Sequence, residues 1–322
     1  MKVVIAPDSF KESMSAKEVC DCAERGILSL FPDWEIVKVP MADGGEGTVE
    51  SLIDGTNGKI YNEETLDPLG EKIVSKYGVL GDKNIAIIEM ATTSGLELIP
   101  ESKRNPYITT TYGTGQLMLK ALDHNVEKII LGIGGSATTD GGAGMLQALG
   151  AKLTDKEGKE IGFGGFELGK LENIDFSGLD ERLKNVEILV ACDVNNPLIG
   201  INGATYVYSK QKGLSESKFQ EVDKYLENFS NIVNNVVKKN NVYNEGSGAA
   251  GGLGFAFMSF SNATIQSGSQ FMINYLGLEE TIQDIDIVIT GEGKLDKQSF
   301  MGKAPIEVAK VAKKYNKKVI FL

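Results

Sequence analysis

Four short apolar runs in this sequence each end at an acidic residue, and a loop of small or polar residues follows. The acidic residues are Asp8 in PDSFKES, Asp43 in MADGGEGT, Asp193 in CDVNNPL and Glu292 in TGEGKLD. Open parallel α/β sheets bind ligands in the crevice beyond the carboxyl ends of their strands. Several carboxylates at such an edge are suitable ligands for Mg²⁺. The pattern therefore predicts a magnesium site.

Lysines accompany these acidic loops: Lys11 in DSFK, Lys212 in KQKG, Lys294 in GEGK and Lys303 in GKAP. Phosphoryl transfer requires a divalent ion, cations on the oxygens that gain charge, and a carboxylate that orients the nucleophile. The sequence contains all three. Any one of these lysines, taken alone, is better explained as a solvated surface residue than as a phosphate contact.

A glycine-rich loop, LGIGGSATTDGGAGM over residues 131–145, follows the apolar run Ile129 to Leu131 and precedes the helical pattern GMLQALGA. The first backbone N–H groups of a helix have no internal partner, and glycines allow a charged oxygen to approach them. The loop is thus suited to a phosphate or a carboxylate, with hydroxyl donors from Ser136, Thr138 and Thr139. Asp140 is placed either to cap the helix or to hold a metal ion.

Other motifs narrow the choice of chemistry. The pattern G-x-x-x-x-G-K-[ST] is absent, which excludes a P-loop protein. GIGGSA at 132–137 and GSGAAG at 246–251 match dinucleotide-binding patterns weakly, because neither has a clear acidic partner about twenty residues later. The single histidine, His124, lies at the end of a predicted helix, so the general base is expected to be a carboxylate.

The bulk composition describes a globular chain of 322 residues with a formal net charge of −11. That charge repels nucleic acids and anionic membranes, and no basic run offsets it. The three cysteines lack the paired spacing of a zinc site or disulfide framework, which fits the cytoplasm. Signal-peptide and membrane-spanning segments are not indicated. The sequence does not indicate the number of subunits.

The order of elements predicts an α/β protein. KVVIAPDS reads as a strand, and Ser15 with Glu18 forms a capping box for the helix that follows. A second strand, EIVKVPM, and a second helix complete a βαβα start, which indicates a parallel sheet. From about residue 59 the chain becomes rich in strands. It returns near residue 285 to the buried strand DIDIVIT, an amphipathic helix opened by Pro305, and the strand KKVIFL.

The sequence resembles the type I glycerate kinases, the bacterial glycerate 2-kinase family. The matching segments run in order along the chain: APDSFKESMSA, PMADGGEGT, EMATTSGLELIP, RNPYITTTYGTGQL, GIGGSATTDGGAGMLQALGA, ACDVNNPLIGINGA, QKG, GAAGGLG, TGEGKLDKQS and GKAP. The resemblance implies ATP-dependent phosphorylation of D-glycerate to 2-phosphoglycerate with Mg²⁺. Two departures are Thr139, where the family usually has asparagine, and YSKQKG, which replaces a typical glycine-proline before Gln-Lys-Gly.

The family fold implied is two α/β domains with the active site in the cleft between them. We expect a discontinuous Rossmann-like parallel-sheet domain over residues 1–68 and 285–322, and an inserted α/β domain over 69–284. Members of the family continue past KKVIFL with a glycine-serine loop. The first domain is therefore expected to be incomplete at its C-terminal end.

The resemblance and the motifs together give each candidate residue a role. Glycerate is expected at the Gly134 to Gly142 loop, and the general base is expected to be Asp193 or Asp296. The substrate-binding candidates are Gly134, Gly135, Ser136, Thr138, Asp140 and Asn196. Candidates for ATP binding are Lys11, Lys212, Lys294, Gly291 and Gly293. Those for Mg²⁺ are Asp8, Asp43 and Glu292. The loops that take ATP and glycerate could be exchanged.

Three alternatives remain open at this point. The chain could phosphorylate another small hydroxy acid, because the sequence does not size the pocket. It could be a catalytically inactive sugar-acid-binding protein. A nicotinamide oxidoreductase is the third reading, and it rests on the two weak dinucleotide patterns.

Overall fold

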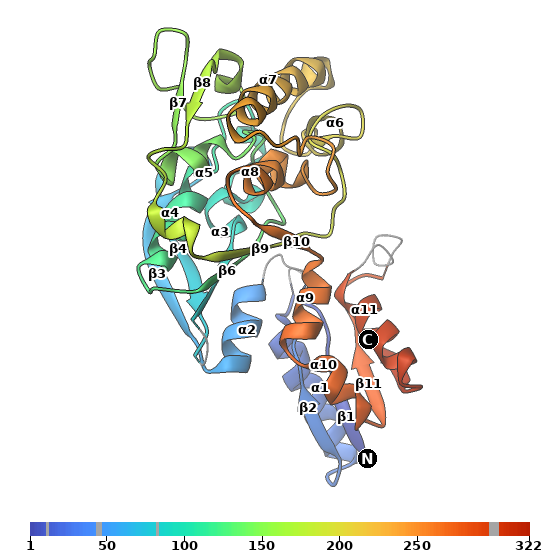
Figure 1. The fold of residues 1–322 in the computed structure, drawn as a ribbon. Helices are drawn as coiled ribbons and strands as arrows, with labels where there is room; N and C mark the ends of the chain where they lie inside the picture. Colours follow the sequence, from blue (N-terminus) through green and yellow to red (C-terminus); the bar gives the residue numbers. More distant parts are fainter. Residues whose placement is uncertain (11–12, 43–46, 82–83, 296–302) are drawn as a thin grey trace.

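The computed structural model describes residues 1–10, 13–42, 47–81, 84–295 and 303–322. Two main β-sheets, each flanked by helices, make up the molecule (Figure 1), and a small separate two-stranded sheet lies at the outer end of the larger half. Most strand pairs in the two main sheets are parallel. The predicted α/β class is therefore confirmed.

A four-stranded parallel sheet joins the two ends of the chain (Figure 1). Its strands, in the order β12, β11, β1, β2, are Lys318–Phe321, Ile287–Thr290, Lys2–Ile5 and Glu35–Lys38. The apolar strand β1 is buried from Val3 to Ile5 and pairs with β11 on one side and β2 on the other. Strands from the first 38 residues and from residues 287–321 thus form one sheet. The domain boundaries at residues 68 and 285 stay a prediction.

Helix α1 (Ala16–Leu30) begins where the sequence predicted, at Ser15. The Glu18 N–H donates to the Ser15 hydroxyl, and the Ser15 N–H donates to the Glu18 carboxylate at 2.8 Å. The predicted capping box is therefore confirmed. Helix α11 (Ala304–Lys314), with Pro305 in its first turn, packs with α9 (Gly268–Tyr275) and α10 (Leu278–Gln283).

The larger sheet has six strands in the order β10, β9, β6, β5, β4, β3. They are Thr264–Gln266, Glu187–Ala191, Lys128–Gly132, Ile85–Glu89, Lys72–Val79 and Lys59–Leu66. Strands β5, β6, β9 and β10 are parallel, whereas β3 and β4 form an antiparallel hairpin. The predicted turn at Asp67 closes this hairpin, because its carboxylate accepts the N–H groups of Leu69 and Glu71. The change of sequence character near residue 59 marks the start of this hairpin.

The larger half also contains the following helices (Figure 1). They are α2 (Thr48–Thr56), α3 (Ala91–Ser94), α4 (Tyr112–Leu122), α5 (Ala143–Ala148), α6 (Ala204–Tyr208), α7 (Phe219–Val237) and α8 (Leu253–Phe260). The two-stranded sheet pairs β7 (Lys152–Thr154) with β8 (Asn173–Asp175). Short 3₁₀ turns connect several of these elements. One of these turns is η2 (Glu101–Lys103).

One apolar cluster connects the two main sheets. It contains Val4 of β1 together with Ile87, Ile130 and Leu189 of the larger sheet. Residues of α2 and α9 belong to the same cluster, and both helices lie between the sheets (Figure 1). Burial of this shared apolar surface stabilises the arrangement of the two sheets.

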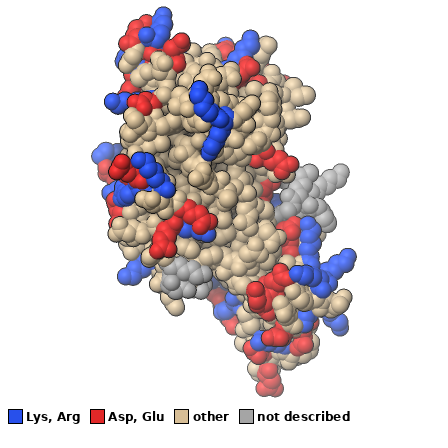
Figure 2. All heavy atoms as spheres, viewed as in Figure 1, with Lys and Arg blue, Asp and Glu red and all other residues tan. Residues whose placement is uncertain are grey.

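The surface carries acidic and basic side chains side by side, with no large basic patch on the face shown in Figure 2. Several ion pairs join two exposed side chains, for example Lys72 with Glu64 at 2.6 Å. Exposed pairs of this kind contribute little to stability. Within the described residues, no helix has both the length and the apolar character needed to cross a membrane.

Candidate active site

A cleft of about 560 Å³ lies at the carboxyl ends of β5, β6 and β9. These strands are parallel neighbours, so the loops that follow them meet at one edge of the larger sheet. Residues from all three loops line the cleft, as do residues from the turn after α6. The lining includes Glu89, Gly134, Gly135, Ser136, Asp193, Tyr208 and Lys212.

The glycine-rich loop after β6 forms one wall of the cleft. Gly135 adopts a left-handed backbone conformation with φ of +72°, which disfavours a residue with a Cβ atom. Its carbonyl accepts the Leu96 N–H at 2.8 Å, and the Ala137 N–H donates to the Ser94 carbonyl at 2.9 Å. The loop is therefore held against the segment that follows β5.

Asp140 lies beneath this loop and is completely buried. Its carboxylate accepts the Thr111 N–H and the Thr111 hydroxyl, each at 2.8 Å. The N–H groups of Gly142 and Gly144, at the start of α5, donate to it as well. Burial raises the pKa of Asp140, while these four hydrogen bonds oppose that shift. The bonds from Gly142 and Gly144 fit the predicted capping role, and the metal-ligand role stays a prediction.

Lys212 reaches the glycine-rich loop from the turn after α6, and only 1% of its surface is exposed. Its ammonium group donates to the Ser136 hydroxyl at 2.8 Å and to the Thr138 carbonyl at 2.6 Å. Burial lowers the pKa of Lys212 to about 7, and the nearby Asp140 opposes this shift. Lys212 thus lies behind Ser136, where an anion in the cleft would favour its protonated form.

Asp193 follows β9 and contributes an exposed carboxylate to the cleft. One of its oxygens accepts the N–H of Gly268, the first residue of α9, at 3.0 Å. The neighbouring Cys192 is less suited to chemistry, because burial raises the pKa of its thiol to about 11. A protonated thiol is a weak nucleophile, so Asp193 stays the predicted reactive group at the end of β9.

Glu89, the last residue of β5, lies in the cleft wall and is 3% exposed. Its carboxylate accepts the Val49 N–H, in the first turn of α2, at 2.8 Å. A negative charge at a helix N-terminus is favourable because unpaired N–H groups and the helix dipole both point to it. Glu89 therefore connects the larger sheet to α2.

Two further acidic residues lie at the carboxyl edge of the four-stranded sheet. The Asp8 N–H donates to the Gly291 carbonyl at 2.9 Å, which places Asp8 beside the loop that carries Glu292. Glu292 is 8% exposed and forms an ion pair with Lys303 at 3.0 Å through Oε2. Its second oxygen, Oε1, is buried without a hydrogen-bond partner.

With this geometry established, comparison with known proteins decides the family. A model of the glycerate kinase family matches residues 3–322. The chain belongs to the glycerate kinase family. The resemblance noted from the sequence motifs is therefore confirmed.

Curated members of the glycerate kinase family match almost the whole chain. The glycerate 2-kinase of Escherichia coli (strain K12) is 53% identical over 320 residues, which cover 99% of this chain and 84% of that protein. The glycerate kinase of Bacillus subtilis (strain 168) is 50% identical with the same coverage. A crystal structure from Salmonella typhimurium LT2, described as a glycerate kinase 2, superposes with a TM-score of 0.93 at 48% identity. The superposition covers 100% of this chain and 86% of the Salmonella chain.

The structure brings some of the predicted site residues of this family member together. Gly134, Gly135, Ser136, Lys212 and Asp193 all line the one cleft. Thr138 and Asp140 are buried behind the loop and act on its shape. Asn196 lies beside the cleft, where its amide donates to the Asn202 carbonyl and its oxygen accepts the Tyr208 hydroxyl.

Other predicted residues lie apart from the cleft lining. Asp8, Gly291, Glu292, Gly293 and Lys294 belong to the loops of the four-stranded sheet. The acidic residues therefore lie on two sheets, with Asp193 on one and Asp8 and Glu292 on the other. Lys11, Asp43 and Asp296 fall outside the described residues. Within the described part of the chain, no three His, Cys, Asp or Glu side chains gather as a metal site.

Sequence reasoning missed Glu89, Tyr208 and Lys76 as cleft residues. Glu89 carried a usable signal, because it ends an apolar strand and is followed by ATTSG, as the other acidic candidates are followed by small or polar residues. Tyr208 and Lys76 carried none. They reach the cleft only because α6 and β4 lie next to it in the folded chain.

Proposed function

We propose that this chain catalyses the ATP-dependent phosphorylation of D-glycerate to 2-phosphoglycerate. The observation that carries the proposal is the cleft at the carboxyl ends of β5, β6 and β9. It combines a glycine-rich anion-binding loop, a cation at Lys212 and an exposed carboxylate at Asp193. The names of the similar proteins give the substrate class.

The glycerate carboxylate is assigned to the loop at Gly134, Gly135 and Ser136. The ammonium group of Lys212 lies directly behind Ser136 and offsets the negative charge of the ligand. This local charge matters because the chain as a whole is acidic, at −11. The loop is already fixed by its bonds to Ser94 and Leu96, so little reorganisation accompanies binding.

The transfer step begins at the 2-hydroxyl of glycerate. Its oxygen forms a new bond to the γ-phosphorus of ATP, the bond between that phosphorus and the bridging oxygen breaks, and ADP leaves. Asp193 accepts the hydroxyl proton. Asp296, the second predicted base, is the alternative acceptor, and the two are distinguished by separate Asp-to-Asn variants.

The loops of the four-stranded sheet are assigned to ATP and Mg²⁺. Asp8 and Glu292 would hold the metal with Asp43, and the buried, unpartnered Oε1 of Glu292 fits a cation ligand. When bound, Mg²⁺ neutralises charge on the phosphate oxygens. Lys11 and Lys294, with Gly291 and Gly293, remain the predicted phosphate contacts. The discontinuous domain arrangement belongs to the same proposal.

A coupled assay of ATP consumption tests the function. D-glycerate, tartronate and lactate are offered separately at equal concentration, with and without Mg²⁺. We expect turnover with D-glycerate that depends on Mg²⁺ and gives 2-phosphoglycerate. Preference for another acid would instead indicate a different hydroxy-acid kinase. Calorimetric binding of glycerate without turnover would indicate a sugar-acid-binding protein.

A further inference from the structure

A second hollow, of about 550 Å³, lies on the other side of the turn that carries Lys212. Two segments, residues 102–108 and 213–218, form most of its walls, and Leu69 completes them. Its volume falls within the usual range for small-molecule sites. None of the roles assigned above uses it.

Three basic residues line this hollow: Lys103, Arg104 and Lys218. Lys218 has an acidic partner, Glu221, at 2.8 Å. Arg104 differs, because its Nε is buried and makes no hydrogen bond. A buried donor without an acceptor is destabilising, and a guanidinium drawn outward to an anionic ligand in the hollow would be relieved of that cost. Three basic residues around one hollow also contrast with the net charge of the chain, which is −11.

The remaining walls are apolar or carry hydroxyl groups. Leu69, Ile108 and Leu214 also line it, and so does Tyr107, whose ring stands edge-on to Phe166. Ser102 and Ser215 are the hydroxyl-bearing residues of the lining. A ligand that satisfies these walls has a compact anionic head and a short carbon body.

We propose that this pocket, named here the Arg104 pocket, binds a small anionic metabolite that carries a phosphate or two carboxylates. The Arg104 guanidinium is its main ligand, because the planar fork matches the oxygens of either group. The Arg104 pocket is separate from the candidate active site and is independent of the proposed function.

The Arg104 pocket and the cleft share one turn of the chain. Lys212 extends from it into the cleft, toward Ser136, whereas Gly213 and Leu214 line the Arg104 pocket. Gly213 has φ of +93°, and a Cβ atom there would lie 2.1 Å from the Arg104 carbonyl oxygen. The turn is therefore packed tightly against the Arg104 segment. A ligand in the Arg104 pocket contacts the chain one residue away from Lys212.

The chain has three arginines, which makes a direct test practical. In ¹⁵N-labelled protein, the Nε–H signals of Arg25, Arg104 and Arg182 are followed while inorganic phosphate or malonate is added, with chloride at matched ionic strength. Arg182 is the internal control, because its guanidinium already binds Asp180 and Asp123. We expect a saturable shift of the Arg104 signal only.

The two probes separate the ligand classes. A response to phosphate alone identifies a phosphate monoester site, and a response to malonate alone identifies a dicarboxylate site. Absence of a saturable Arg104 shift with both probes overturns the proposal, and so does an equal response to chloride. None of these readouts depends on kinase activity, so a failed kinase assay leaves them unaffected.

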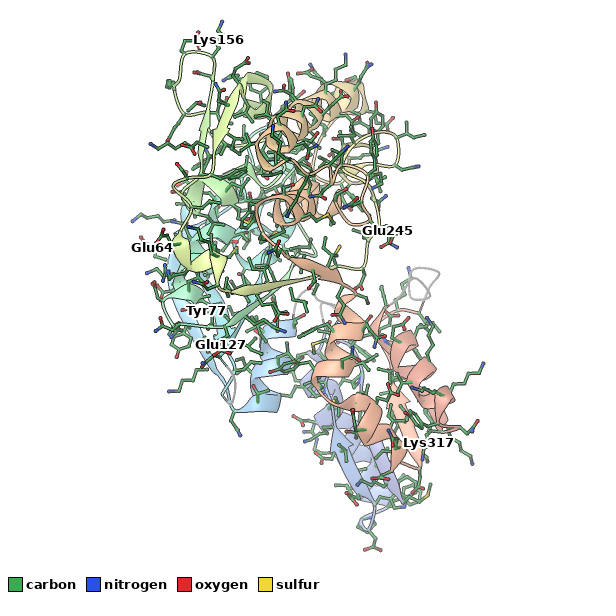
Figure 3. All side chains as sticks on the ribbon, viewed as in Figure 1. Glu64, Tyr77, Glu127, Lys156, Glu245 and Lys317 are labelled. Atoms are coloured by element: carbon green, nitrogen blue, oxygen red, sulfur yellow. The ribbon has the colours of Figure 1, made fainter. Side chains whose placement is uncertain are left out.

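A variant tests the part played by the guanidinium. Arg104→Lys keeps the charge and removes the fork, and the amide signals of Gly213 and Leu214 then report binding. We expect the apparent Kd of the responding probe to rise at least tenfold. An unchanged Kd would show that Arg104 is not the ligand. Lys156→Met, at the exposed loop tip between β7 and β8 (Figure 3), should bind as the unmodified protein does.

Discussion

The buried ammonium of Lys212 makes the stability of the protein depend on pH in a defined direction. Burial lowers its pKa from the ordinary 10.5 to about 7. Between these values the unfolded chain binds the proton and the folded chain releases it. The free energy of unfolding therefore rises with pH over this window, and the cost of the buried charge is complete below about pH 7.

The size of the effect follows from the two pKa values. Each unit of pKa difference corresponds to about 1.4 kcal/mol. From pH 7 to pH 9, Lys212 should contribute an increase of about 2 kcal/mol to the free energy of unfolding. Lys212→Met removes the titrating group, so the variant should lack this increase.

Urea unfolding followed by circular dichroism at pH 7, 8 and 9 measures the effect. Cys20 and Cys192 also matter in this range, because burial raises both thiol pKa values and so lowers stability as pH rises. Both cysteines remain in Lys212→Met, so their contributions to the pH dependence cancel when the two proteins are compared. Lys156→Met, an exposed substitution, is the matched control. Equal pH dependence in the unmodified protein and Lys212→Met would refute the reasoning.

Three further outcomes are expected. Asp193→Asn should remain folded and lose about 10² to 10⁴ in kcat, measured by coupled ATP consumption; near-normal turnover would remove it as the base. Lys294→Ala should raise the apparent KM for ATP while Lys156→Ala leaves it unchanged, and equal KM values would exclude a phosphate contact. Asp140→Ala leaves four donors without an acceptor and should lower the free energy of unfolding by about 3 to 5 kcal/mol. The exposed Asp175→Ala should have a much smaller effect in the same urea experiment, and similar losses would contradict the capping role.

Local features of the fold could be predicted where the signal lies within a few residues. The capping box at Ser15 and the turn at Asp67 are of this kind, because their hydrogen bonds join neighbours in sequence. The glycine loop between β6 and α5 was recognisable for the same reason. Each such prediction depends on chemistry that a short segment completes by itself.

The assembly of the site depends on contacts between distant residues, which no local pattern contains. The Lys212 ammonium meets the Ser136 hydroxyl across 76 positions, and Glu89 meets the start of α2 across 40. The sequence showed that Asp8 and Asp193 each end a strand. The local pattern did not show that these strands lie in different sheets, because strand order is decided by packing. Only the domain bounds expected from the family resemblance separated them.

The hydrogen bond between Asp193 and the N–H of Gly268, the first residue of α9, ties the cleft to a helix packed between the two sheets. A displacement of α9 relative to the larger sheet must either stretch this bond or carry the Asp193 carboxylate along with it. The position of the predicted base in the cleft is thereby coupled to the packing between the two sheets.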